Sequence, residues 1–140
     1  MTAFTNIPPH AVLPLGAYDL DELRRCARRA DQRLLYVDLS EAANKAEVLD
    51  SLAKAFELPA HFGRNLDALY DCMTELKPLP DADQPGFVVI LKSMPGPEMF
   101  SADDRNALLD VFRDTAEFFF DRDMAFRMFY SIRPRPSAPT

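Results

Sequence analysis

The feature of this sequence that most constrains its fold is the uninterrupted apolar run Phe-Val-Val-Ile-Leu at residues 87–91. A strand with one face in solvent alternates apolar and polar residues, because successive side chains point to opposite faces of the sheet. In this run, the residues at odd-numbered positions and those at even-numbered positions are all apolar. The run therefore predicts a strand that is covered on both faces. Such strands are typical of parallel sheets in α/β proteins.

Two further strands and several helices complete the predicted fold. Residues 34–39 form a short apolar run rich in strand formers, and residues 125–132 form the last predicted strand. Apolar positions three and four residues apart predict helices beginning at Asn44 and Ser101, and another over about 65–76. Strands joined by helical crossovers form parallel sheets with right-handed connections. We therefore predict an α/β fold with a small parallel sheet of about three strands and helices packed mainly on one face.

Composition divides the chain into three parts. Residues 1–33 are predicted to form an N-terminal extension, in which a proline-rich arm with a short strand near Val12–Leu13 precedes a short helix. Residues 34–132 are predicted to form the main domain. Residues 133–140 are rich in proline and are predicted to form a disordered tail.

Length, charge and cysteine content exclude several classes of protein. A chain of 140 residues suffices for one domain with a core, and a net charge of −6 argues against a general nucleic-acid binder, which needs a basic face. Neither a membrane-spanning run nor a signal peptide is expected. Cys26 and Cys72 lack the spacing of a metal site and are expected to be packed thiols in a cytoplasmic protein. Four arginines of the N-terminal helix fit a solvated surface better than a nucleic-acid patch: Arg24, Arg25, Arg28 and Arg29.

The helix predicted over 65–76 has an apolar face and an acidic face. The apolar face consists of Leu66, Leu69, Met73 and Leu76, and the acidic face consists of Asp67, Asp71 and Glu75. Tyr70 falls at the boundary between them. Like charges one turn apart are mildly destabilising, so helix stability does not account for this pattern. Two interpretations remain: a merely solvated acidic face, or a face that binds a basic partner.

The segment LPAHFGRNLDALYDCMT at residues 58–74 resembles the signature segment of the barstar family, which inhibits secreted ribonucleases of the barnase type. The segment VFRD at residues 111–114 resembles the last helix of that family, and the predicted order of strands and helices fits its fold. The resemblance leaves residues 1–33 unaccounted for. It implies an inhibitor with no catalytic role and no cofactor.

The resemblance also implies a binding mechanism and a set of contact residues. In the family, an Asp of the acidic helix takes the place of the RNA phosphate among basic side chains of the ribonuclease. By motif position that residue is Asp71, with Asp67 as a supporting contact and Asp114 as a further acid on the last helix. The implied partner is a ribonuclease, or a ribonuclease toxin, with a basic cleft. The full set of implied contact residues is His61, Asn65, Asp67, Tyr70, Asp71, Thr74 and Asp114.

Several positions depart from the family pattern, Glu75 and Leu76 among them, and they leave alternatives open. Arg64 stands where an acid is usual, and His61 and Tyr70 replace other aromatic residues, which indicates specificity for a different ribonuclease. A second possibility is a protein-interaction module of the same fold that no longer inhibits a ribonuclease. A third is a small enzyme with His61 as a base oriented by Asp67 or Asp71. No candidate nucleophile, phosphate-binding loop or metal cluster accompanies that histidine in the sequence.

Overall fold

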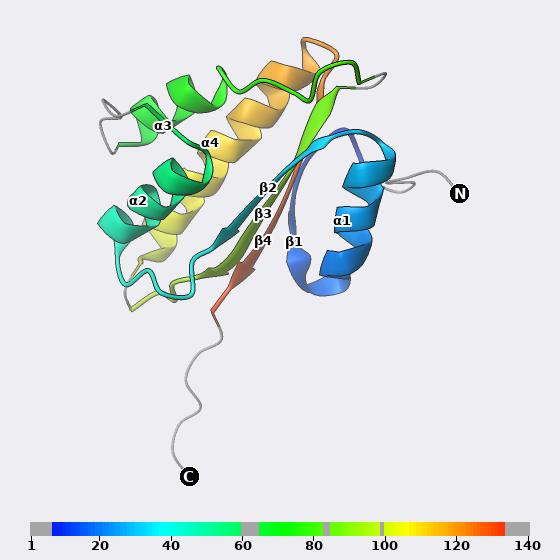
Figure 1. The fold of residues 1–140 in the computed structure, drawn as a ribbon. Helices are drawn as coiled ribbons and strands as arrows, with labels where there is room; N and C mark the ends of the chain where they lie inside the picture. Colours follow the sequence, from blue (N-terminus) through cyan, green and yellow to red (C-terminus); the bar gives the residue numbers. More distant parts are fainter. Residues whose placement is uncertain (1–6, 60–64, 83–84, 99, 134–140) are drawn as a thin grey trace.

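Strand β3 (Gly86–Met94) lies inside a four-stranded parallel sheet with the strand order β1-β4-β3-β2. The computed structural model describes residues 7–59, 65–82, 85–98 and 100–133 (Figure 1). Phe87, Val89 and Leu91 point into one apolar cluster, and Val88 and Ile90 point into the other. All five side chains are 0% exposed, which confirms a strand that is covered on both faces.

The other strands are β1 (His10–Pro14), β2 (Arg33–Asp38) and β4 (Ala125–Ile132). The sheet therefore has four strands where about three were predicted. The additional strand is β1, in which His10 pairs with Phe126 and Pro14 with Tyr130 of β4. Its own sequence is a weak strand signal, because it is short and ends in proline. Residues 10–14 form a strand because they pair with β4, which is more than a hundred residues away in the sequence.

Helices α2 (Lys45–Ala55), α3 (Leu66–Met73) and α4 (Ala102–Phe120) cover one face of the sheet, and α1 (Leu20–Arg29) covers the other (Figure 1). This arrangement confirms the prediction of helices mainly on one face. A side chain caps the N-terminus of each helix by accepting a backbone N–H; the capping residues are Asp19, Asn44, Asn65 and Ser101. A short 3₁₀ helix, Leu15–Ala17, follows β1.

Helix α3 is shorter than predicted, because it ends at Met73 rather than near Leu76. The amides of Glu75 and Leu76 donate to carbonyls three residues earlier, at 3.1 and 3.2 Å, so the chain continues in turns instead of an α-helix. Pro78 follows closely, and proline disfavours helical conformation in the residue before it.

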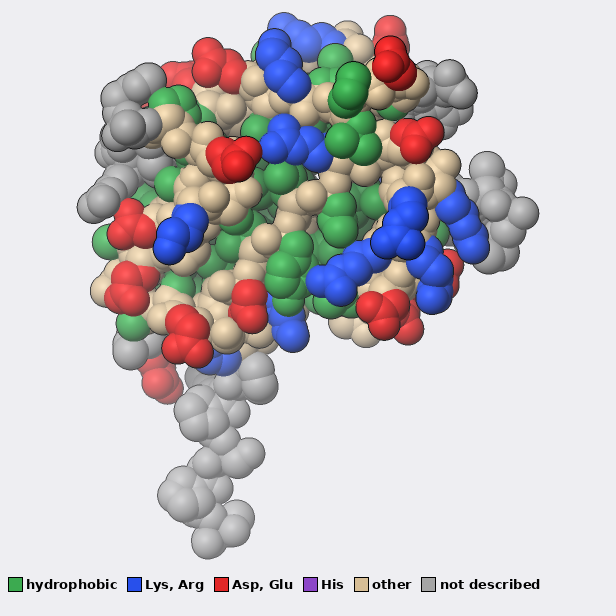
Figure 2. Space-filling model, viewed as in Figure 1, with side chains coloured by type: hydrophobic (Ala, Val, Ile, Leu, Met, Phe, Trp, Pro, Cys, Tyr) green, Lys and Arg blue, Asp and Glu red, His purple; other side chains and the backbone are tan. Residues whose placement is uncertain are grey.

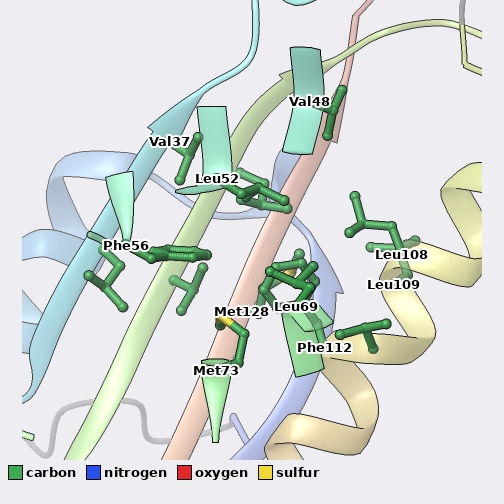
Figure 3. Close-up of a cluster of buried hydrophobic side chains, with 14 of the residues drawn as sticks. Val37, Val48, Leu52, Phe56, Leu69, Met73, Leu108, Leu109, Phe112 and Met128 are labelled. Atoms are coloured by element: carbon green, nitrogen blue, oxygen red, sulfur yellow. The ribbon is translucent and has the colours of Figure 1, made fainter. Parts of the chain in front are cut away.

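The main core lies between the sheet and helices α2, α3 and α4 (Figure 3). Each helix contributes side chains that are at most 2% exposed; they include Leu52, Phe56, Leu69, Met73, Leu109 and Phe112. Fully burying a side chain of this size contributes about 1.5–3 kcal/mol. The core therefore holds α3 in one rotation about its own axis.

The described chain ends at Arg133, which belongs to the folded part of the molecule. Its amide donates to the carbonyl of Met94, and its Nη2 donates to the carbonyls of Leu39, Ser40 and Ala42 at 2.7, 2.7 and 3.1 Å. The rest of the predicted tail, 134–140, lies outside the described residues. Among the helices that are described, none has the length and apolar character needed to cross a membrane.

Candidate protein-binding face

Helix α3 turns its acidic residues toward solvent because its apolar residues are held in the core. Leu69 and Met73 are 0% exposed, and Figure 3 shows both pointing into the cluster beneath the helix. Asp67 and Asp71 are one turn apart on the opposite side of the helix, and both are exposed. The fold thus brings these two carboxylates together on one outward face.

Asn65 determines where this face begins. Its Oδ1 accepts a hydrogen bond from the backbone N–H of Ala68 at 2.8 Å, so Asn65 is the N-cap of α3. A cap of this kind is worth about 1 kcal/mol. Asp67 consequently lies in the first turn, where the partial positive charge of the helix N-terminus favours a carboxylate. Asn65 therefore has a structural role, whatever its contacts with a partner.

Thr74 is the C-cap of α3 and marks the other end of the acidic face. Its hydroxyl donates to the backbone carbonyl of Asp71 at 2.9 Å, and its own amide donates to the carbonyl of Tyr70 at 3.0 Å. These bonds fix the last turn while the carboxylate of Asp71 stays exposed. Asn65 and Thr74 thus hold the two ends of the short helix that presents Asp67 and Asp71.

Tyr70 connects the acidic helix to α4. Its half-buried ring meets the ring of Phe118 edge-on, with 6.5 Å between centroids and 84° between planes. The guanidinium Cζ of Arg122 lies 3.5 Å from the centroid of the Phe118 ring, and its Nη1 donates to the carbonyl of Phe118 at 2.9 Å. Tyr70 therefore packs on the ring of Phe118, and the guanidinium of Arg122 stacks on that same Phe118 ring.

Asp114 belongs to the same side of the molecule as Tyr70. It is exposed on α4, one helical turn before Phe118, and residues four apart lie on the same side of a helix. Asp114 therefore lies on the flank of α4 that faces α3. The fold thus places the third predicted acid beside the helix that carries the first two. His61 and Arg64, by contrast, lie outside the described residues.

Phe118 and Arg122 are site residues that the sequence did not reveal. The signal available was the run of three phenylalanines at 118–120, of which only Phe119 lies on the core stripe of its helix. Phe119 is 2% exposed, whereas Phe120 is 44% exposed and packs against the ring of His10. The run itself predicts that Phe118 or Phe120 lies under the N-terminal extension or at a dimer contact; Phe120 takes the place under the extension, and only the packing of α3 on α4 shows that Phe118 meets Tyr70.

The surroundings of Cys72 on α3 change the pKa of its thiol. Partial burial raises its pKa, and the negative charges of Glu75 and Asp71 raise it further. Cys72 therefore stays a neutral thiol to higher pH than a free cysteine. It is unsuited to act as a nucleophile, because nucleophilic cysteines have lowered pKa values.

The arrangement is suited to binding a positively charged surface. It offers carboxylates on two neighbouring helices, a tyrosine at their boundary and a thiol that is hard to ionise. Within the described ranges, no three His, Cys, Asp or Glu side chains are grouped to hold a metal ion. A field of negative charge of this kind attracts a basic protein surface and speeds its encounter.

Two comparisons with known proteins bear on this face. A model of the family described as "Barstar (barnase inhibitor)" matches residues 32–131, which include the whole of α3 and α4. The chain is also similar to the Bacillus subtilis (strain 168) protein named "Putative ribonuclease inhibitor YrdF". The two are 28% identical over 85 residues, which cover 61% of this chain and 87% of that protein. The match to the family begins after β1 and α1.

Proposed function

The chain belongs to the barstar family, and from that premise we propose that it inhibits a ribonuclease by inserting the acidic face of α3 into the active-site cleft of the enzyme. One observation carries the proposal. Asp67 and Asp71 are exposed side by side on α3, while Leu69 and Met73, at 0% exposure, anchor the same helix in the core. The charges are thus presented on a rigid support.

Each carboxylate has a role in this proposal. Asp71 takes the place of an RNA phosphate among basic side chains of the enzyme, and Asp67 supports it from one turn earlier. Asp114 adds a contact from α4. A carboxylate and a guanidinium about 4 Å apart attract each other by roughly 4 kcal/mol at an effective dielectric constant of 20, before the cost of desolvation.

The remaining predicted contact residues surround these carboxylates. Tyr70 and Thr74 lie beside Asp71 on or next to α3, and Asn65 lies at the start of the helix. His61 precedes α3 in the chain. Each is proposed to contact the rim of the cleft. The preorganised helix lowers the entropy lost on binding, because its carboxylates need no rearrangement of the backbone.

The proposed partner is a ribonuclease, or a ribonuclease toxin, with a basic cleft. The net charge of −6 favours encounter with such a surface. The protein acts as a binding partner without catalysis, and as an inhibitor it would work in the cytoplasm of the cell that makes the ribonuclease. The curated relative is named as a ribonuclease inhibitor, which supports this role. The arginine at position 64 favours a target whose rim differs from that of barnase.

The test compares two variants that remove the same charge. Asp71→Asn removes it from the binding face, and Asp31→Asn removes it from the exposed turn after α1, where the backbone φ of 54° suits asparagine. Ribonucleases co-purified with the chain are assayed for inhibition, and barnase serves as the reference enzyme. We expect Asp71→Asn to weaken binding by about 3 kcal/mol in calorimetry, as when one member of a desolvated ion pair is removed. Asp31→Asn should bind as the unmodified chain does.

Equal affinities for the two variants would contradict this use of Asp71. A partner that binds through α3 but has no ribonuclease activity would instead support the interaction module. The N-terminal extension, which lies outside the segment that matches the family, favours that second candidate modestly.

A further inference from the structure

Strand β2 forms one edge of the sheet, and its outer side offers backbone groups for another strand. The amide of Leu39 donates to the carbonyl of Lys92 at 2.8 Å, so the odd-numbered residues of this segment direct their backbone groups toward β3. The amides and carbonyls of Leu34 and Tyr36 therefore point away from the sheet. No backbone–backbone hydrogen bond reaches them from outside β2 and β3 in the described parts of the chain. Edges of this kind accept an added strand.

The α1 side of this edge is apolar and bordered by arginines. Leu34 and Tyr36 are half-buried and pack in the cluster beneath α1. The guanidinium Cζ of Arg24 lies 5.0 Å from the centroid of the Tyr36 ring. Arg28 is one turn further along and lies on the same side of the helix. Figure 2 shows the basic side chains gathered over α1, with apolar side chains visible in the middle of the same face.

We propose that the outer edge of β2 is a docking site for an extended acidic segment of a partner protein. Main-chain hydrogen bonds to Leu34 and Tyr36 align the segment as an additional strand. Because side chains alternate between the two faces of a sheet, every second side chain of the segment faces α1. A carboxylate at these positions meets Arg24 or Arg28.

The charges of the two arginines are available to such a segment. Arg24 has only a loose ion pair with Asp21, at 3.9 Å, in which the two side chains are 41% and 78% exposed. A pair this exposed is worth little and exchanges readily for another carboxylate. Within the described residues, Arg28 is in no ion pair. This docking site is separate from the acidic face of α3, because α1 and α3 lie on opposite sides of the sheet (Figure 1).

A second copy of the chain fits this edge less well. Antiparallel pairing of two β2 strands about a two-fold axis leaves both α1 helices on the same face of the joined sheet. Arg24 and Arg28 of one copy would then face those of the other, and opposed like charges are destabilising. The arginines thus disfavour self-pairing and favour an acidic strand.

The experiment uses the full chain labelled with ¹⁵N and a blocked peptide of alternating Glu and Val, about eight residues long to match an ordinary strand. We expect added peptide to slow amide hydrogen exchange at Leu34 and Tyr36. The amides of Leu35 and Val37 already face β3, and Leu69 lies in α3, so their exchange should not change. A peptide of alternating Lys and Val is the control and should leave all these amides unaffected.

Two double variants with the same change in charge test the role of the arginines. Arg24→Glu with Arg28→Glu reverses the flank of α1 beside β2, whereas Arg25→Glu with Arg29→Glu reverses the next flank. We expect the first pair to weaken binding of the Glu peptide about tenfold and to allow binding of the Lys peptide. The second pair should change binding by less than about threefold, as expected for exposed charges at a distance.

Several results would overturn the proposal. Equal weakening in both double variants would indicate non-specific attraction. Protection of other amides, with Leu34 and Tyr36 unchanged, would place the peptide elsewhere, and failure of the peptide to bind at millimolar concentration would exclude this occupant. Protection of Leu34 and Tyr36 that grows with protein concentration in the absence of peptide would identify a second copy as the occupant.

Discussion

The ring of Tyr70 meets the ring of Phe118 edge-on, with centroids 6.5 Å apart, and this contact joins the acidic helix α3 to α4. Asp114 lies one turn before Phe118 on the same side of α4. The contact therefore influences where the carboxylates of α3 lie relative to Asp114. A binding face spread over two helices depends in this way on Phe118, which carries no charge of its own.

Replacing Phe118 with alanine should weaken both folding and partner binding. The substitution removes a half-buried ring that packs against Tyr70 and Arg122, so we expect a loss of about 2 kcal/mol in the free energy of unfolding. Urea unfolding measures this loss, and calorimetry with the co-purified ribonuclease measures the loss of affinity. Phe120→Ala is the matched control, because Phe120 is 44% exposed and packs on His10 away from α3. If both variants bind the ribonuclease equally well, Phe118 does not support the face.

Substitutions at Asn65 should test its role as the N-cap of α3. Asn65→Ala removes the acceptor for the amide of Ala68 and should lower the free energy of unfolding by about 1 kcal/mol. Asn65→Asp keeps an acceptor and should fold as stably as the unmodified chain. Urea unfolding tests both expectations. If Asn65→Asp were as unstable as Asn65→Ala, the cap would not be the source of the loss.

Local sequence patterns predicted most of the individual elements. The apolar run at 87–91 predicted β3, because a strand buried on both faces needs no polar alternation. Helix α3 and its acidic face followed from the spacing of Leu69 and Met73, since one helical period decides which side chains are buried. The burial of β3 and the two faces of α3 depend on residues close together in the sequence, so the sequence of each segment is enough to predict them.

Relationships between distant segments could not be predicted in the same way. The short β1 is a strand because His10 pairs with Phe126, and nothing in its five residues specifies that partner. The contact between Tyr70 and Phe118 likewise depends on how α3 packs against α4. The run of three phenylalanines showed that the core could not take them all, but it did not show which element would cover each ring.

The reactivity of Cys72 should report on the charge of Asp71. Burial, then Glu75 and then Asp71 raise the pKa of this thiol, so at a pH of about 8.5 it contains less thiolate than an unperturbed cysteine. We expect iodoacetamide to alkylate Cys72 slowly, with a rate that rises only at higher pH. Asp71→Asn should shift that pH profile downward, because it removes one of the charges that oppose ionisation. Peptide mass spectrometry separates Cys72 from Cys26, which lies on α1 and serves as the internal reference.

Arg133 should stabilise the fold although it lies beyond the segment that matches the barstar family. Its Nη2 donates to the carbonyls of Leu39, Ser40 and Ala42, and its backbone amide donates to Met94, so it joins the chain after β4 to the loop after β2 and the end of β3. Arg133→Ala removes the side-chain donor and leaves partly buried carbonyls without it. We expect the free energy of unfolding in urea to fall by about 1–3 kcal/mol.

Arg133→Lys is the matched control, because it keeps the charge but lacks the planar guanidinium. It should recover only part of the lost stability if hydrogen bonding to the carbonyls is what matters. Full recovery by lysine would show that charge alone is sufficient, for example beside Asp38, whose pKa is lowered mainly by hydrogen bonds from Ser40 and also by the charges of Lys92 and Arg133. An alanine variant as stable as the unmodified chain would mean that water replaces the Arg133 side chain at no cost, and the guanidinium would then contribute nothing to the stability of the fold.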